Sequence, residues 1–134
     1  IWPAAPTALI CLLIYRIIND ERFLRWAEAV GRQYMKQTFP DDVAIPANDA
    51  GLALDLLADL YDITGDRVWL DGGLALSSQL LDIYMDGDLP RGAAGIDWYE
   101  SQMGPSFLLH GLARIALLAE GRENCPLKDD YTAR

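Results

Sequence analysis

Basic residues are scarce in this chain, whose 134 residues include 11 Lys and Arg against 20 Asp and Glu, for a net charge of −9 at pH 7. A nucleic-acid-binding surface needs a basic stripe that neutralises phosphates, and the sequence contains no such stripe. The composition therefore argues against nucleic acid as a partner. It leaves acidic sugars open, because one or two local arginines can hold a carboxylate within an acidic protein.

Cysteine and histidine are also rare, with two cysteines and one histidine. Cys11 and Cys125 make no disulfide framework and no metal-ligand spacing, and we interpret them as a small buried residue and a free thiol in a tail. No Gly-rich phosphate loop or Ser-His-Asp spacing occurs, and residues 86–88 lack the glutamate that completes a calcium loop. The sequence thus predicts no metal and no cofactor.

Long apolar runs are missing too. The longest, Ala8 to Ile18, is interrupted by Arg16 and is well short of the roughly 20 residues that span a bilayer. The first residues lack the basic start of a signal peptide, so we predict a buried helix, no membrane partner, and a soluble protein with the cytoplasm slightly favoured. Because the chain begins with Ile1 rather than Met, we interpret it as a fragment, the C-terminal portion of a longer protein.

Two similar turns lie 46 residues apart, over residues 17–24 (IINDERFL) and 63–70 (ITGDRVWL). In each, a helix ends, a polar pair turns the chain, and Asp20 or Asp66 can cap the next helix, which opens with an aromatic-Leu pair. Such an echo is typical of a helical-hairpin repeat.

The hydrophobic pattern predicts an all-α fold of antiparallel helical hairpins in two layers. Five helices are expected, at residues 6–18, 21–37, 49–63, 67–84 and from 102 or 105 to 119. The first, third and fifth are apolar nearly all round and should form a buried inner layer, whereas the second and fourth are amphipathic and should lie outside. We divide the chain into a helical domain, 1–121, and a polar tail, 122–134.

The connections between hairpins, residues 38–48 and 86–97, are longer than the turns within them. Short turns and long loops should therefore collect at opposite ends of the array, with the N-terminal ends of the third and fifth helices among the long loops. Functional groups concentrate on loops that a rigid scaffold positions. The long-loop end is therefore the expected place of a site.

Two segments carry a family resemblance: Thr64 to Leu70 (TGDRVWL) and Tyr99 to Leu109 (YESQMGPSFLL). The pattern resembles the six-hairpin (α/α) toroid superfamily of carbohydrate-active proteins, and the second segment is similar to a stretch near the end of unsaturated glucuronyl and rhamnogalacturonyl hydrolases. The resemblance implies a glycoside hydrolase acting on uronic-acid-containing or unsaturated sugars by carboxylate acid/base chemistry. This chain supplies about two and a half hairpins, so the remainder of a toroid would come from a longer chain or from other subunits.

The candidate site follows from the long-loop end. Hydration of an unsaturated uronide, the reaction of the resembled hydrolases, needs chiefly one acid/base carboxylate, and Asp49 and Asp97 are the candidate catalytic residues. Aromatic rings that stack on sugars, and polar groups that bind hydroxyls, surround them in the sequence. The candidate substrate-binding residues are Trp2, Asn48, Arg91, Trp98, Tyr99, Glu100, Gln102 and His110.

Each of these roles has a structural alternative. Asp49 can be a helix cap, and Asp97 with Glu100 matches a capping box. His110 is either a satisfied core histidine or a cleft residue. For Asp59 and Arg114, buried pairing across neighbouring inner helices is the preferred interpretation.

The function has alternatives as well. A non-catalytic helical-repeat domain that binds protein, or an accessory domain of a larger enzyme, would show the same periodicity. A lyase or a sugar epimerase is less favoured, because the epimerases of this superfamily work with a pair of histidines and this chain has one.

Overall fold

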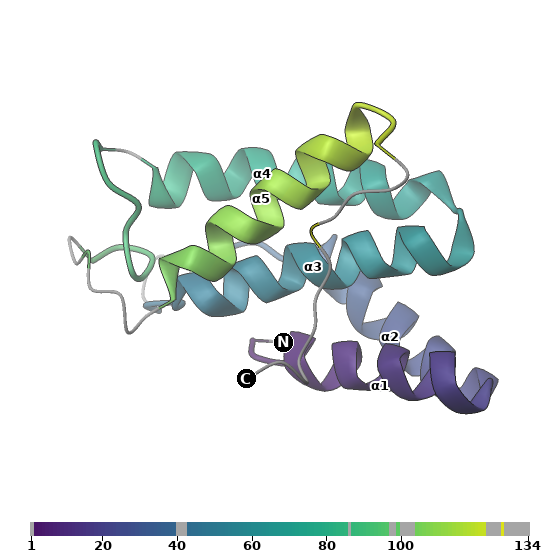
Figure 1. Ribbon diagram of the computed structural model, residues 1–134. Helices are drawn as coiled ribbons and strands as arrows, with labels where there is room; N and C mark the ends of the chain where they lie inside the picture. The colour runs from purple at the N-terminus through teal and green to yellow at the C-terminus, as the bar shows by residue number, and fades with distance from the viewer. Residues whose placement is uncertain are drawn as a thin grey trace.

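The computed structural model describes residues 2–39, 43–85, 87–96, 99, 104–122 and 127. These ranges contain five α-helices and no β-strand beyond isolated bridges, so the all-α prediction is confirmed (Figure 1). The helices are α1 (Ala5–Ile18), α2 (Glu21–Tyr34), α3 (Ala47–Thr64), α4 (Arg67–Tyr84) and α5 (Pro105–Ala119). None of them is long and apolar enough to cross a membrane.

The two short turns are built alike. Asp20 accepts a hydrogen bond from the backbone N–H of Arg22 at 3.0 Å, and Asp66 accepts one from Val68 at 3.1 Å. Each carboxylate thus satisfies one of the free N–H groups at the start of a helix, as predicted. The preceding helix ends in each case at a left-handed residue, and at the second turn this is Gly65, with φ of 69°.

Helix α3 is the centre of the array and packs against the other four helices. Helix α2 lies against α1 and α3, and α4 lies against α3 and α5, which gives an inner row of α1, α3 and α5 with α2 and α4 outside it (Figure 1). All ten residues from Gly51 to Leu60 are buried. The prediction of burial on every side therefore holds for α3.

The same prediction is wrong for the other two inner helices. Ile10 and Ile17 of α1 are 49% and 74% exposed, and Leu109 of α5 is 45% exposed. Because α1 and α5 stand at the two edges of the array, each has a neighbour in the row on one side only. Their outer sides carry apolar residues that the rest of the described chain does not cover.

Glycines set the closest contact in the array, between α3 and α5. A Cβ on Gly51 would stand 2.3 Å from the carbonyl carbon of Phe107, and one on Gly111 would stand 2.7 Å from the carbonyl oxygen of Gly51. Real side chains do not tolerate such distances, so only glycine permits this approach of backbone to backbone. This close contact fixes the position of the N-terminal end of α5 relative to that of α3.

Candidate functional site

The N-terminal ends of α3 and α5 meet at the long-loop end, as predicted (Figure 1). The loop after α4 runs beside the segment before α3, where Ala47 N–H donates to the carbonyl of Gly92 at 2.8 Å and Ala94 N–H donates to that of Ile45 at 2.9 Å. Gly104 precedes α5 and lies against Asn48, since a Cβ on Gly104 would be 2.7 Å from the Asn48 Cβ. Asn48 and Asp49 therefore lie where the two long loops converge.

Asp49 occupies the first turn of α3 and does not cap it. The N-cap is Pro46, with no side-chain cap hydrogen bond, and the N–H of Ala47 is satisfied by Gly92 from the distant loop. The helix thus begins two residues before the predicted start, and the interpretation of Asp49 as a cap is wrong. Asn48 instead turns its side-chain oxygen back to accept the N–H of Asp49 at 2.8 Å.

The Asp49 side chain is half-buried, and this burial raises its pKa above the ordinary value of an aspartate. Within the described ranges no Lys or Arg pairs with the carboxylate. A carboxyl that holds its proton more tightly than usual is suited to general acid catalysis nearer to neutral pH. Helix formation does not require such a group at this position.

An aromatic cluster lies beside Asp49. The Trp2 ring is 4.7 Å from that of Tyr34 and 5.3 Å from that of Phe39, and Phe39 is 6.4 Å from Tyr84. Burial raises the pKa of Tyr34 to about 12, and the charge of Asp49 adds to the increase. The same two causes raise the pKa of Tyr84. The Asp49 carboxylate therefore lies near enough to both phenols for its negative charge to disfavour their ionisation.

The predicted binding residue Trp2 is a member of this cluster and is itself half-buried. Its indole N–H is buried and has no acceptor in the part of the chain that the structure describes. The tyrosines below it are anchored, because the Tyr34 hydroxyl accepts the N–H of Ala5 at 2.9 Å and the Tyr84 hydroxyl donates to the carbonyl of Ile45 at 2.7 Å. These two hydrogen bonds hold the aromatic cluster in place at the long-loop end.

Arg91 has a structural task in addition to any predicted contact with substrate. Its guanidinium donates to the carbonyl of Ile83 at 3.2 Å and its N–H donates to that of Tyr84 at 2.8 Å, so it closes the C-terminal end of α4. A cation at this end also suits the helix dipole. Sequence reasoning missed this role, because the capped carbonyls lie seven and eight positions earlier in the chain.

Of the five candidates between residues 97 and 102, the structure describes Tyr99, which is 45% exposed. Its hydroxyl lies 3.7 Å from the place of a Cβ on Gly87, within the same loop. The other candidates fall outside the described residues, and these are Asp97, Trp98, Glu100 and Gln102.

His110 lies deeper in the array, away from Asp49. Its Nδ1 is 3.1 Å from the carboxylate of Asp55, which is fully buried, while the imidazole itself is 28% exposed. Asp55 stands about 9 Å along the helix axis from Asp49, at 1.5 Å per residue. His110 is thus a hydrogen-bonded residue at the edge of the core rather than a member of the Asp49 group.

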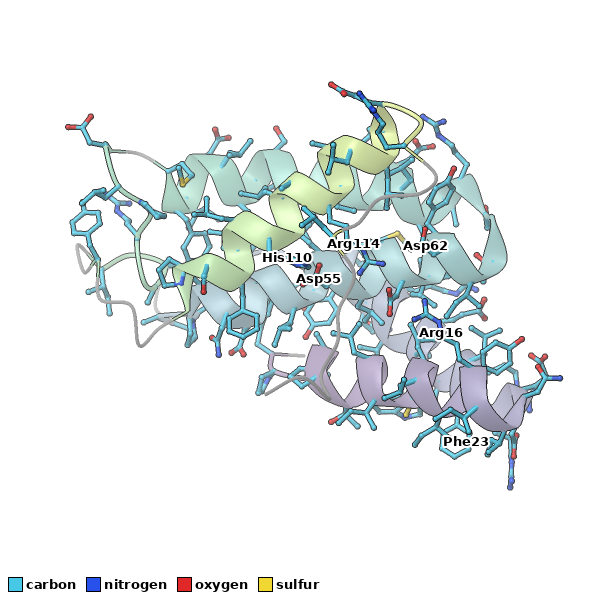
Figure 2. All side chains as sticks on the ribbon, in the orientation of Figure 1. Arg16, Phe23, Asp55, Asp62, His110 and Arg114 are labelled. Atoms are coloured by element: carbon cyan, nitrogen blue, oxygen red, sulfur yellow. The ribbon has the colours of Figure 1, made fainter. Side chains whose placement is uncertain are left out.

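His110 and Asp55 belong to a larger charged network between α3 and α5. The fully buried Arg114 binds Asp59 and, at 2.9 Å, Asp62, and it lies 3.8 Å from Asp55. Figure 2 shows the labelled Arg16 of α1 reaching toward this group, and its guanidinium is 3.5 Å from Asp59.

The predicted pairing of Asp59 with Arg114 is confirmed. The network's full extent was not predicted, although the sequence carries a signal for it: carboxylates at positions 55, 59 and 62 follow one face of a helix. Arg114 and the carboxylates that it binds neutralise one another's charge within the protein. Among the described residues, no group of three His, Cys, Asp or Glu side chains is arranged to bind a metal ion.

The raised pKa of Asp49 has a consequence for stability. The folded state holds this proton more tightly than the unfolded chain, so the carboxyl's contribution to stability is fully present below the unfolded pKa and is lost as the pH rises through the folded pKa. We expect Asp49→Asn, which stays neutral, to match the wild type near pH 3 and to be the more stable protein near pH 7. Thermal unfolding at the two pH values measures this, and a less stable Asn variant near pH 7 would instead indicate a stabilising anion at the helix start.

Comparison with known proteins gives no family to which the chain can be assigned. No family model, curated protein or solved structure matches it. The half-buried Asp49 at the converging loops, with its raised pKa, is the most distinctive of the predicted site residues that the structure describes.

Proposed function

We propose that this chain is part of a carbohydrate-active α/α-toroid protein, a glycoside hydrolase acting on uronic-acid-containing or unsaturated sugars, with Asp49 as its acid/base carboxyl. The observation that carries the proposal is the Asp49 side chain, half-buried among converging loops, with a raised pKa and no Lys or Arg on it in the described ranges. Glycoside chemistry depends on such a carboxylic acid, whose pKa is raised by its surroundings.

In the proposed reaction Asp49 first donates its proton to the carbon–carbon double bond of an unsaturated uronide. Water then adds to the resulting cation, and the Asp49 carboxylate accepts one proton from that water, so the group ends as it began. The net change is the addition of one water across the double bond. A single carboxyl serves both steps, which fits a site in which the structure describes one such group.

The surroundings of Asp49 suit a sugar. Trp2 and Phe39, which are half-buried, lie at the same end and pack on the fully buried Tyr34 and Tyr84. A sugar site is commonly an apolar, aromatic surface with a few polar groups that fix orientation. Asn48 stands directly beside the acid.

The first test of the proposal is binding. An oligogalacturonate titrated into the full chain should give saturable chemical-shift changes at the amides of Asn48 and Asp49. With an unsaturated uronide as substrate, Asp49→Asn is expected to lower the rate of hydration by at least about 100-fold, the usual contribution of a positioned acid or base.

Asp71→Asn is the matched control, because Asp71 is an exposed carboxylate of α4 that pairs with Arg67 at 3.2 Å. This variant should bind and react like the wild type. The proposal is wrong if no uronic-acid oligosaccharide binds, or if the Asp49 and Asp71 variants react equally fast.

A further inference from the structure

Asp55 of α3 is a fully buried carboxylate whose partners lie on α5. Both of its oxygens stand beside Nδ1 of His110, at 3.1 and 3.2 Å (Figure 2). The imidazole is 28% exposed, whereas the Asp55 side chain has no exposed surface. The histidine can therefore exchange a proton with water, and the carboxylate beside it is out of reach of water when that proton leaves.

Arg114 is a second cation near Asp55 in the part of the chain that the structure describes, and it is placed closer to other carboxylates. Its guanidinium binds Asp59 and, at 2.9 Å, Asp62, and it stands 3.8 Å from the Asp55 carboxylate. One arginine thus serves three carboxylates of α3. Among the described residues, the closest ionisable partner of Asp55 is His110.

The surroundings of His110 favour its protonated form. An opposite charge within about 4 to 6 Å stabilises a charged group, and a buried carboxylate without a close counter-charge is costly. Within the described ranges, the charged groups on this side of the array lie on α3, α5 and α1, and they are Asp55, Asp59, Asp62, Arg114 and Arg16. Among them, the Asp55 carboxylate makes the hydrogen bond to the imidazole.

His110 stands next to the closest contact between α3 and α5. Its neighbour Gly111 lies against Gly51, where a Cβ on Gly111 would be 2.7 Å from the Gly51 carbonyl oxygen. A carboxylate that loses its counter-charge is stabilised by water, and water gains access to the buried Asp55 when α5 moves away from α3. A change in the charge of His110 therefore acts on the contact that positions α5.

We propose that His110 and Asp55 form a pH-sensitive switch in the contact between α3 and α5. Near neutral pH the imidazole is protonated and its charge holds the buried carboxylate, whereas at higher pH it is neutral and the contact weakens. The folded state then binds this proton more tightly than the unfolded chain. The contribution to stability is therefore fully present below the unfolded pKa of about 6.5 and is lost as the pH rises through the folded pKa.

This inference is independent of the proposed sugar chemistry. It concerns a different carboxylate, which lies about 9 Å along the helix axis from Asp49 at 1.5 Å per residue. The two carboxylates also titrate in different ranges, because an aspartate ordinarily titrates near pH 3.9 and a histidine near pH 6.5. Failure of one proposal would leave the other standing.

The first test is an NMR titration of the imidazole, whose signal is unambiguous because the chain has one histidine. We expect the full chain to hold the His110 proton at least about one pKa unit above the ordinary value of about 6.5. In Asp55→Asn the titration should fall back toward that value. In Asp71→Asn, which removes an exposed carboxylate of α4, it should stay where it is in the wild type.

Two results of this titration would overturn the switch. The first is a wild-type imidazole that titrates at or below about 6.5, because the histidine would then be a neutral hydrogen-bond donor at physiological pH. The second is an unchanged titration in Asp55→Asn, because the buried carboxylate would then not hold the proton.

Urea unfolding at pH 6 and pH 8.5 measures the effect on the fold. One pKa unit is worth up to a factor of about ten in the unfolding equilibrium constant, and we expect the wild-type constant to rise at least about 5-fold between these pH values. His110→Gln keeps an N–H donor for Asp55 but cannot gain a charge, so its constant should change little. Equal pH dependence in the two proteins would count against the switch, and if the glutamine variant does not fold, the wild-type NMR titration decides.

Discussion

Replacing Arg114 with methionine is expected to lower the free energy of unfolding by about 3 to 5 kcal/mol, the cost of removing one partner from a buried ion pair. Arg114 is completely buried and binds Asp59 and Asp62, and the fully buried Asp55 lies 3.8 Å away. Methionine fills much of the space but removes the buried cation between Asp55 and Asp59, and the partly exposed Arg16, 3.5 Å from Asp59, replaces only part of that charge. Since folded domains are stable by only about 5 to 15 kcal/mol, this one substitution should remove a large share of the total.

Arg67→Gln is the matched control for this prediction. Arg67 pairs with Asp71 four residues along α4, and both side chains are more than 60% exposed, so removing this pair should cost no more than about 0.5 kcal/mol. Urea unfolding followed by circular dichroism measures both variants. If Arg114→Met lost less than about 1 kcal/mol, the carboxylates would not depend on the arginine as buried charges do.

Gly51→Ala is expected to lower the free energy of unfolding by about 1 to 3 kcal/mol, the usual cost of overpacking a core. The added Cβ would stand 2.3 Å from the Phe107 carbonyl carbon and 2.4 Å from the N of Leu108. Because these are backbone atoms of α5, no side chain can rotate away, and α5 must move. Alanine favours a helix over glycine by up to about 1 kcal/mol, which the clash should outweigh.

Gly72→Ala separates the clash from the general effect of replacing a helical glycine. A Cβ on Gly72 meets the flexible end of Met35 rather than backbone, and methionine side chains adapt readily. We expect the stability of this variant to change little, or to rise through better helix propensity. Equal losses in the Gly51 and Gly72 variants, measured by urea unfolding, would contradict close backbone contact as the reason for Gly51.

Local signals in the sequence were enough to predict the two short turns and the bounds of α4. The predicted bounds of α4 are those observed, because Asp66 caps its first turn within two residues. The start of α3 was predicted two residues late, since its first free N–H is satisfied by Gly92 from a loop far along the chain. Gly72 and Gly73 of α4 lie close to Met35 and Ile115, respectively, which are partners that the sequence of α4 does not identify.

The candidate site was predictable to the extent that it depends on topology. The pattern of loops placed Asn48 and Asp49 correctly at the converging ends of two inner helices. It did not reveal that Arg91 would bind the end of α4, because that contact depends on the path of the loop after the helix. The i, i+4 spacing of Asp55 with Asp59 on α3, and of His110 with Arg114 on α5, did indicate that these pairs could meet, as they do. Which residue meets which depends on the rotation of one helix against the other, which the periodicity of single helices does not specify.

The most direct measurement of the central claim is an NMR titration of the side-chain carboxyl carbon of Asp49, with and without an oligogalacturonate. We expect Asp49 to titrate above the ordinary aspartate pKa of about 3.9, and we expect its pKa to change further when the sugar binds. An Asp49 that titrates at or below the ordinary value, and that does not respond to the sugar, would contradict the proposed acid/base site.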